Sequence, residues 1–235
     1  MSDLPPLPAS TPLQSELRRL YLARSGALSD ADGLVRCLVL ELAGPPEWCE
    51  LSRVWQGVQA ELDLPAPGIA VSGIDGLQLW FSLADPVSVS QGQAFLQGLV
   101  SRFLADVEPR RLRLLPTEDQ PVRLVPAEQV STGNWSAFLA QDLAPVFADT
   151  PWLDIPPGDE GQTALLRVLH VVKPAVFEAA FSRLAPRAAA VALPALAAGD
   201  PRQFLLRVMN DEGVAMALRI EAAKALLPYL GGQAV

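Results

Sequence analysis

Residues 70–83 read Ala70-Val71-Ser72-Gly73-Ile74-Asp75-Gly76-Leu77-Gln78-Leu79-Trp80-Phe81-Ser82-Leu83. An apolar run is followed by a Ser-Gly-x-x-Gly segment and then by apolar residues at the alternate positions 77, 79 and 81. This order predicts a β-hairpin, in which Gly73 and Gly76 supply positive φ angles and Asp75-Gly76 is a favoured turn pair. The hairpin predicts that the chain contains a β-sheet.

Hydrophobic periodicity on either side of the hairpin predicts further elements. Strands are expected at residues 36–42, 111–115 and 122–125. Helices are expected over residues 16–25, 47–62, from about 90 to 103 with Ser90 as N-cap, and 134–147. Strands and helices that follow one another in this order predict an α+β domain with a mixed or antiparallel sheet and flanking helices.

The domain organisation follows from composition. Residues 1–13 hold four prolines and are expected to form a flexible tail. A proline-rich linker predicts a boundary near residue 155, which separates an α+β domain over residues 14–154 from a small all-α module over residues 155–235. Helices of this module are expected at residues 162–172, 174–184, 188–198, 201–209 and 214–230.

Composition limits the classes of function. The chain has 235 residues, half of them hydrophobic, and a net charge of −8, which argues against a surface that generally coats nucleic acid. The N-terminus lacks the features of a signal peptide, and no apolar run approaches the roughly 20 residues of a membrane span. We therefore expect a cytoplasmic protein that does not contact a membrane.

The sequence carries no strong motif for nucleophilic catalysis, zinc binding or a phosphate-binding loop. The single histidine, His170, lies in an apolar helical segment without a surrounding nucleophile motif. Cys37 and Cys49 are too few for a zinc site, and no phosphate-binding lysine loop is present. One cluster of basic residues remains, which is either a phosphate contact or a solvated strand face: Arg110, Arg111, Arg113 and Arg123.

The strand at 36–42, the following helix, the hairpin and the later strand resemble the pattern of archaeo-eukaryotic primases and primase-polymerases over about residues 35–130. In that family the first strand ends in Asp-x-Asp, whose carboxylates bind catalytic metals. A histidine on the second hairpin strand contacts the nucleotide phosphates, and a later acidic residue completes the metal site. The resemblance implies two-metal phosphoryl-transfer chemistry as the family's activity.

The key positions are substituted in this chain. The Asp-x-Asp position falls on Glu41-Leu42-Ala43, the histidine position on Gln78, and the later acidic position on Arg113. Glu41 is the remaining metal candidate, so Mg²⁺ or Mn²⁺ is expected only if this altered site retains metal. Asp75 is the nearest substitute carboxylate, although turn chemistry alone explains it.

The resemblance therefore implies a catalytically inactive primase-like domain that binds nucleotide or single-stranded nucleic acid. Trp80 is the tryptophan best placed by the hairpin to stack on a base. The candidate binding residues are Ser72, Gln78, Trp80, Arg111, Arg113 and Arg123. Two alternatives remain open, which are a scaffolding protein without a nucleic-acid role and an active nucleotidyltransferase with rearranged metal ligands.

The C-terminal module carries a second resemblance. Residues 200–211 and 219–229 are similar to a helical motif of phage-associated proteins, including small terminase subunits. Asp200 and Pro201 are the expected N-cap and first residue of one helix of a pair. We expect residues 160–235 to contact a protein partner.

Overall fold

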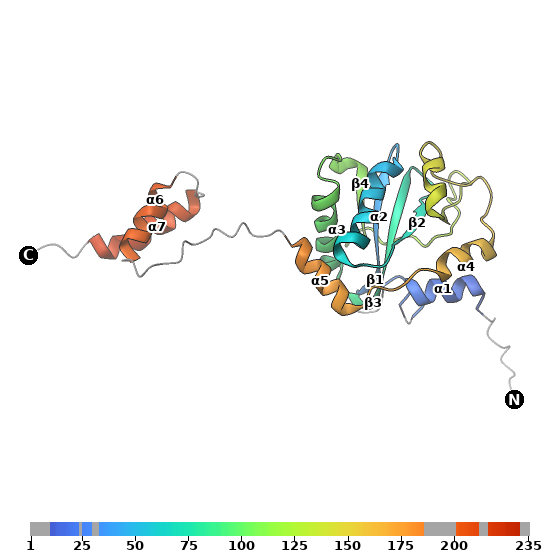
Figure 1. Cartoon of the computed structure of the whole chain (residues 1–235), viewed down its shortest axis with the longest axis horizontal. Coiled ribbons are helices and arrows are strands. Elements are labelled where there is room, and N and C mark those ends of the chain that lie inside the picture. Colours follow the sequence, from blue (N-terminus) through green and yellow to red (C-terminus); the bar gives the residue numbers. More distant parts are fainter. Residues whose placement is uncertain (1–9, 24, 30–32, 186–200, 212–215, 231–235) are drawn as a thin grey trace, which may run out of the picture. The chain divides into compact units, whose positions relative to one another are not determined.

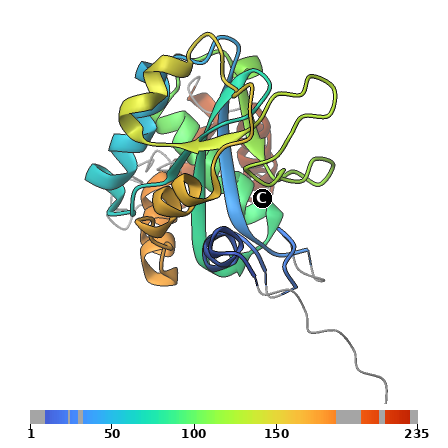
Figure 2. The ribbon, with the colours of Figure 1, turned by 90° about the vertical axis from the view of Figure 1, so that its right-hand side faces the viewer.

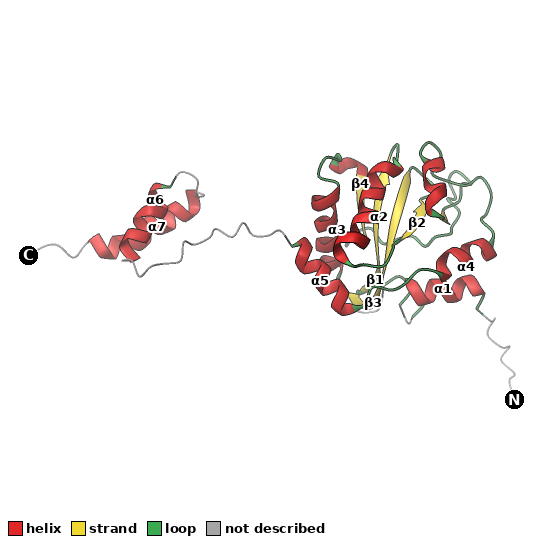
Figure 3. Cartoon of the chain, viewed as in Figure 1, coloured by secondary structure: helices red, strands yellow, loops and turns green. Residues whose placement is uncertain are grey.

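The structure, a computed structural model, describes residues 10–23, 25–29, 33–185, 201–211 and 216–230. The chain divides into two compact units, residues 1–187 and 188–235. The first holds a five-stranded antiparallel sheet with flanking helices, which confirms the α+β class (Figure 3). The unit boundary lies after residue 187, whereas the composition had placed it near residue 155.

The sheet has the order β4-β1-β3-β2-β5. Its strands are β1 (Val35–Ala43), β2 (Gly68–Val71), β3 (Gly76–Val87), β4 (Leu112–Leu115) and β5 (Ala137–Leu139). β2 and β3 form the expected hairpin, with Val71 opposite Leu77. β3 continues to Val87, beyond the predicted end at residue 83, and pairs along nearly all of β1.

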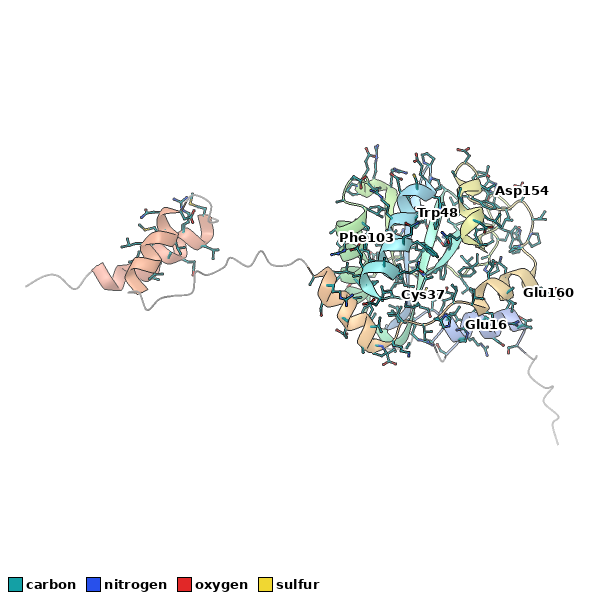
Figure 4. The ribbon with its side chains drawn as sticks, viewed as in Figure 1. Glu16, Cys37, Trp48, Phe103, Asp154 and Glu160 are labelled. Carbon is teal, nitrogen blue, oxygen red and sulfur yellow. The ribbon has the colours of Figure 1, made fainter. Side chains whose placement is uncertain are left out.

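Side chains alternate between the two faces of the sheet, so each face has its own apolar core. Leu38, Leu40 and Leu42 of β1 belong to one core, which α2 (Trp48–Leu62), α3 (Val89–Phe103) and α5 (Pro174–Leu184) cover (Figure 1). Cys37 and Val39 belong to the other core, which α1 (Pro12–Leu20) and α4 (Asp159–Arg167) cover. Figure 4 labels Glu16 on α1 and Glu160 on α4, which pack side by side.

Two helix starts differ from expectation because side-chain caps decide them. α1 begins at Pro12, ahead of the predicted residue 16, since Thr11 and Gln14 form a reciprocal capping box. α3 is capped by Ser88, whose hydroxyl accepts a hydrogen bond from the Gln91 amide at 3.2 Å, so Ser90 is not the N-cap. The helix expected at 47–62 is confirmed as α2.

The helix predicted over residues 134–147 is wrong. Residues 137–139 form β5, and a 3₁₀ segment, η2 (Gln141–Phe147), follows it with Pro145 inside. Pairing with β2 accounts for the change, together with the Gln162 side chain, which bonds both backbone groups of Phe138 at 2.8 and 3.0 Å. A helical spacing of apolar residues was overridden by tertiary contacts.

Residues 122–125 do not form the expected strand. They belong to the long loop after β4, drawn in yellow-green in Figure 2, and a short 3₁₀ turn, η1 (Pro109–Arg111), precedes β4. Prolines at 121 and 126 flank this segment and carry no backbone N–H group for a sheet ladder. Val122 and Val125 are nevertheless buried, so the loop packs against the sheet.

The helices expected over 162–172 and 174–184 belong to the first unit. α4 ends at Arg167, and Val172 then bonds to β3 through its amide and carbonyl at 2.7 and 2.9 Å from Ser82 and Ala84. α5 has the predicted bounds. The helix predicted over 188–198 lies outside the described residues.

The second unit contains α6 (Pro201–Asn210) and α7 (Met216–Leu230), close to the two predicted helices. Arg219 donates a hydrogen bond to the Met209 carbonyl at 3.0 Å, and Ala222 and Leu226 are buried. Among the described residues, no helix combines the length and the apolar character that crossing a bilayer requires.

Candidate functional site

Three of the sequence-predicted positions lie side by side on three neighbouring strands. Glu41 of β1 stands opposite Gln78 of β3 on one side and opposite Arg113 of β4 on the other. Residues directly opposite each other in an antiparallel sheet project from the same face. The strand registers therefore bring the three polar side chains together on the face that α1 and α4 partly cover.

These side chains form a continuous hydrogen-bonded chain. Gln78 Nε2 donates to Glu41 Oε2 at 2.6 Å, and Arg113 Nη1 donates to Glu41 Oε1 at 2.5 Å. Trp80 Nε1 donates to Gln78 Oε1 at 2.8 Å. Glu41 is only 4% exposed, so both of its oxygens are satisfied within the protein rather than by bulk water.

Asp75, from the hairpin turn, completes this cluster. Arg113 donates to it from two nitrogens, Nη1 to Oδ1 at 2.7 Å and Nη2 to Oδ2 at 2.9 Å. The hydrogen bonds that Arg113 donates to Asp75, and after them the one that it donates to Glu41, raise the pKa of the Arg113 guanidinium above its ordinary value. One guanidinium thus neutralises part of the charge of two carboxylates.

The turn that carries Asp75 is held by Ser72. Its Oγ accepts hydrogen bonds at 3.0 to 3.1 Å from the backbone amides of Ile74, Asp75 and Gly76. Gly73 has φ +79°, as expected, whereas Gly76 does not adopt a positive φ. Glycine is needed at position 76 for another reason, because a Cβ there would lie 2.8 Å from Glu41 Cγ and Oε1.

A cavity of about 530 Å³ opens beside this cluster, between the sheet face and the loop after β4. Its size is in the range of small-molecule sites. The polar lining residues are Glu41, Ser72, Gln78, Arg113, Asp119, Gln120, Arg123, Gln129 and Ser136. The apolar lining residues include Val39, Leu115, Val122, Leu124 and Val125.

Arg123 differs from Arg113 in its surroundings. It is exposed, and its Nη1 donates to the neutral Gln129 Oε1 at 3.2 Å. Gln129 is 8% exposed, and its Nε2 donates to the Ser72 carbonyl at 3.3 Å. Within the described part of the chain, Arg123 forms no salt bridge, so its charge is available to an anion in the cavity.

Two candidate residues lie away from the cavity lining. Trp80 is 1% exposed and packs against Tyr21 and Phe138, with ring centroids 5.1 and 5.4 Å apart, so it cannot stack on a base in this structure. Arg111 is bound to Glu50 at 2.8 and 3.2 Å and to the Pro45 carbonyl at 2.8 Å. It connects η1, the turn before β4, to the start of α2 rather than offering its charge to phosphate.

Glu41, the metal candidate, does not fit a divalent cation. Mg²⁺ and Mn²⁺ need several carboxylate or carbonyl oxygens that converge on one point. Here the Arg113 guanidinium holds both Glu41 and Asp75. Over the ranges described above, no group of three or more His, Cys, Asp or Glu side chains is arranged to hold a metal ion.

Sequence reasoning missed one member of the site and one contact. Asp75 is predicted as the nearest substitute carboxylate and as a turn residue, but its pairing with Arg113 is not predicted. Gln129 comes from an irregular loop without periodicity, and no local signal indicates its contact with Ser72 and Arg123.

No protein-family model matches this chain, and no curated protein sequence does either.

Proposed function

We propose that the chain binds a nucleotide, either free or at the end of a single strand, in the sheet-face cavity and does not transfer it. The observation that carries this proposal is the convergence of Glu41, Gln78 and Arg113, the three positions of the primase-like pattern, on one cavity. Arg123 adds to the same lining a cation that has no carboxylate partner among the described residues.

The Arg113 contacts support a binding role without catalysis. Metal-dependent phosphoryl transfer needs carboxylates that are free to hold two cations against the attacking and leaving oxygens. Glu41, which lines this cavity, and Asp75 on the adjacent turn are both hydrogen-bonded to the Arg113 guanidinium at 2.5 to 2.9 Å. A divalent cation in that position would face the positive charge of Arg113.

A long single strand on the surface is supported less well than one nucleotide in the cavity. Extended binding of single strands relies on a basic groove and exposed aromatic rings. Arg111 is bound to Glu50, Trp80 is buried, and the chain carries a net charge of −8. These features favour a local site over a long electrostatic track.

The experiment is isothermal titration of the full chain with mononucleotides and a short oligothymidylate, at low and moderate salt. We expect saturable binding at one site, and Gln78→Leu should weaken it because this substitution removes polar atoms from the lining. Arg110→Gln is the matched control, since Arg110 is exposed and, in the described part of the chain, pairs only with Glu108. The absence of binding to every probe at low salt would refute the proposal.

Primer extension with Mn²⁺ tests the non-catalytic part separately. We expect no incorporation by the wild-type chain. Incorporation that disappears in Glu41→Ala would show that the site retains catalysis through this carboxylate, and the inactive assignment would then be wrong.

A protein-assembly role for the second unit is a separate candidate, favoured by its exposed apolar residues. Four large apolar side chains of this helix pair are 37% to 65% exposed: Leu206, Met216, Leu218 and Ile220. A two-helix unit of this size rarely stabilises itself without a partner. Light scattering of the full chain and of Leu218→Gln tests this role, and an equal mass for both at every concentration would count against it.

A further inference from the structure

Several polar groups that line the cavity keep hydrogen-bond donors that no contact among the described residues uses. Ser72 Oγ accepts three backbone hydrogen bonds, and no acceptor for its own proton is seen within the described residues. The Gln78 and Gln129 amides each use one N–H, towards Glu41 and the Ser72 carbonyl. Among the described residues, each amide therefore keeps a second N–H group for a ligand. Arg123 adds its own remaining N–H groups.

The charges of the site limit the anion that it accepts. Three carboxylates belong to the cavity or its Arg113 cluster, namely Glu41, Asp75 and Asp119, against the two guanidiniums of Arg113 and Arg123. The charge of Arg113 is balanced by Glu41 and Asp75, so Arg123 is the guanidinium of the described lining that has no carboxylate partner. One guanidinium matches one phosphate group, and each additional phosphate adds repulsion from the carboxylates.

The apolar part of the lining matches the rest of such a ligand. The apolar side chains that border the polar cluster include Val39, Leu115, Val122, Leu124 and Val125. A nucleobase has a flat apolar face and a rim of acceptors, which suits apolar walls beside free donors. A sugar phosphate without a base would leave this apolar wall uncovered.

Resting on the nucleotide-binding proposal above, we infer that the ligand is a nucleoside with a single phosphate, and that the cavity discriminates against nucleoside di- and triphosphates. Arg123 binds the phosphate, and the free donors of Ser72, Gln78 and Gln129 bind acceptor atoms of the nucleoside. This selectivity follows from Arg113, which pairs with the two carboxylates that could otherwise hold a cation against a polyphosphate.

The test is titration of the full chain with uridine, UMP, UDP and UTP in EDTA and again with Mg²⁺. Uridine nucleotides are chosen because the two base carbonyls match the free donors. We expect UMP to bind about tenfold more tightly than uridine, as a charge-assisted contact of the phosphate with Arg123 implies. In EDTA, the affinity for UTP should be lower than that for UMP by about threefold or more, because the carboxylates repel the additional phosphates.

The variants separate the inference from the function on which it rests. Arg123→Gln should reduce UMP affinity to that of uridine, while Arg123→Lys should restore part of it; Arg110→Gln should leave it unchanged. Tighter binding of UTP than of UMP, or an unchanged UMP affinity in Arg123→Gln, would overturn the monophosphate inference while nucleotide binding stands. Failure of all four probes to bind would overturn both.

Discussion

Arg113 Nη1 contacts Glu41 Oε1 at 2.5 Å across the β1–β4 pairing, so a guanidinium lies against a carboxylate that is almost fully buried. A buried carboxylate needs a charged or hydrogen-bonded partner, since transfer from water otherwise costs several kcal/mol. Gln78 contributes one such hydrogen bond, and Arg113 contributes the compensating charge. The pair thus stabilises the sheet at the place where the cavity is built.

Removal of the guanidinium is expected to destabilise the fold. Arg113→Ala leaves Glu41 without its cation, and we expect a loss of about 2 kcal/mol in the free energy of unfolding. The loss is smaller than for a fully buried pair because the Arg113 side chain is 43% exposed and water screens part of the interaction. Urea unfolding measures the change. Arg110→Ala, which removes an exposed arginine, should change stability by less than about 0.5 kcal/mol.

The buried hydroxyl of Tyr21 gives a prediction of opposite sign. Tyr21 is fully buried, and its hydroxyl has no partner among the described residues. Tyr21→Phe removes an unsatisfied polar group, so we expect stability to stay equal or to rise by about 1 kcal/mol. Ser82→Ala is the matched comparison, because the Ser82 hydroxyl donates to the Leu20 carbonyl at 2.5 Å, and its loss should cost about 1 kcal/mol. A clear loss in Tyr21→Phe would indicate a bridging water in the adjacent cavity of about 10 Å³.

Tyr21 also predicts how stability depends on alkaline pH. Burial raises the pKa of its hydroxyl well above the ordinary value of 10.0. The folded chain then keeps a proton that the unfolded chain loses, so this contribution is complete below pH 10 and declines as the pH rises further. Unfolding midpoints measured above that pH should fall less steeply in Tyr21→Phe than in the wild type. Equal slopes would contradict the assignment.

The two cysteines are expected to differ in reactivity. Cys37 is buried, and its burial raises the pKa of the thiol; Cys49 is exposed, and its hydrogen bond to Glu47 raises the pKa of that thiol. Because the thiolate is the reactive form, native labelling with iodoacetamide should modify Cys49 slowly and spare Cys37. Glu47→Gln should accelerate labelling of Cys49 several-fold at neutral pH. Labelling rates followed by mass spectrometry test this, and rapid modification of Cys37 would contradict the packing.

The strands that build the site were largely predictable because their signals are local. Two strands are defined by the apolar run at 36–42 and by the alternation of residues 77, 79 and 81, and the glycine turn defines the hairpin. Antiparallel pairing then places Glu41 beside Gln78. The helix prediction for residues 134–147 was wrong because helical spacing cannot reveal a pairing with β2. Pro145 within the segment also prevents a regular α-helix.

The partners within the site were less predictable than the strands. The bidentate contact of Arg113 with Asp75 depends on the turn conformation that Ser72 maintains, and the position of Gln129 depends on a loop of irregular backbone. Such contacts join segments distant in sequence and leave no periodic pattern. The burial of Trp80 was likewise decided by α1, whose Tyr21 neighbour covers it.

The cluster of Arg113, Glu41 and Asp75 predicts that one substitution creates a metal-binding site. Arg113→Asp replaces the guanidinium with a carboxylate directly opposite Glu41 in the strand register, while Asp75 remains on the adjacent turn. Three carboxylates would then face one another without an internal cation, which is the oxygen donor set that Mn²⁺ prefers. We expect this variant to be less stable than the wild type without metal and to regain stability when Mn²⁺ is added. Electron paramagnetic resonance of free Mn²⁺ measures binding, and Arg113→Ala, which supplies one carboxylate fewer, should bind more weakly. If Arg113→Asp binds no Mn²⁺ and gains no stability from it, the guanidinium does not occupy the place of a cation.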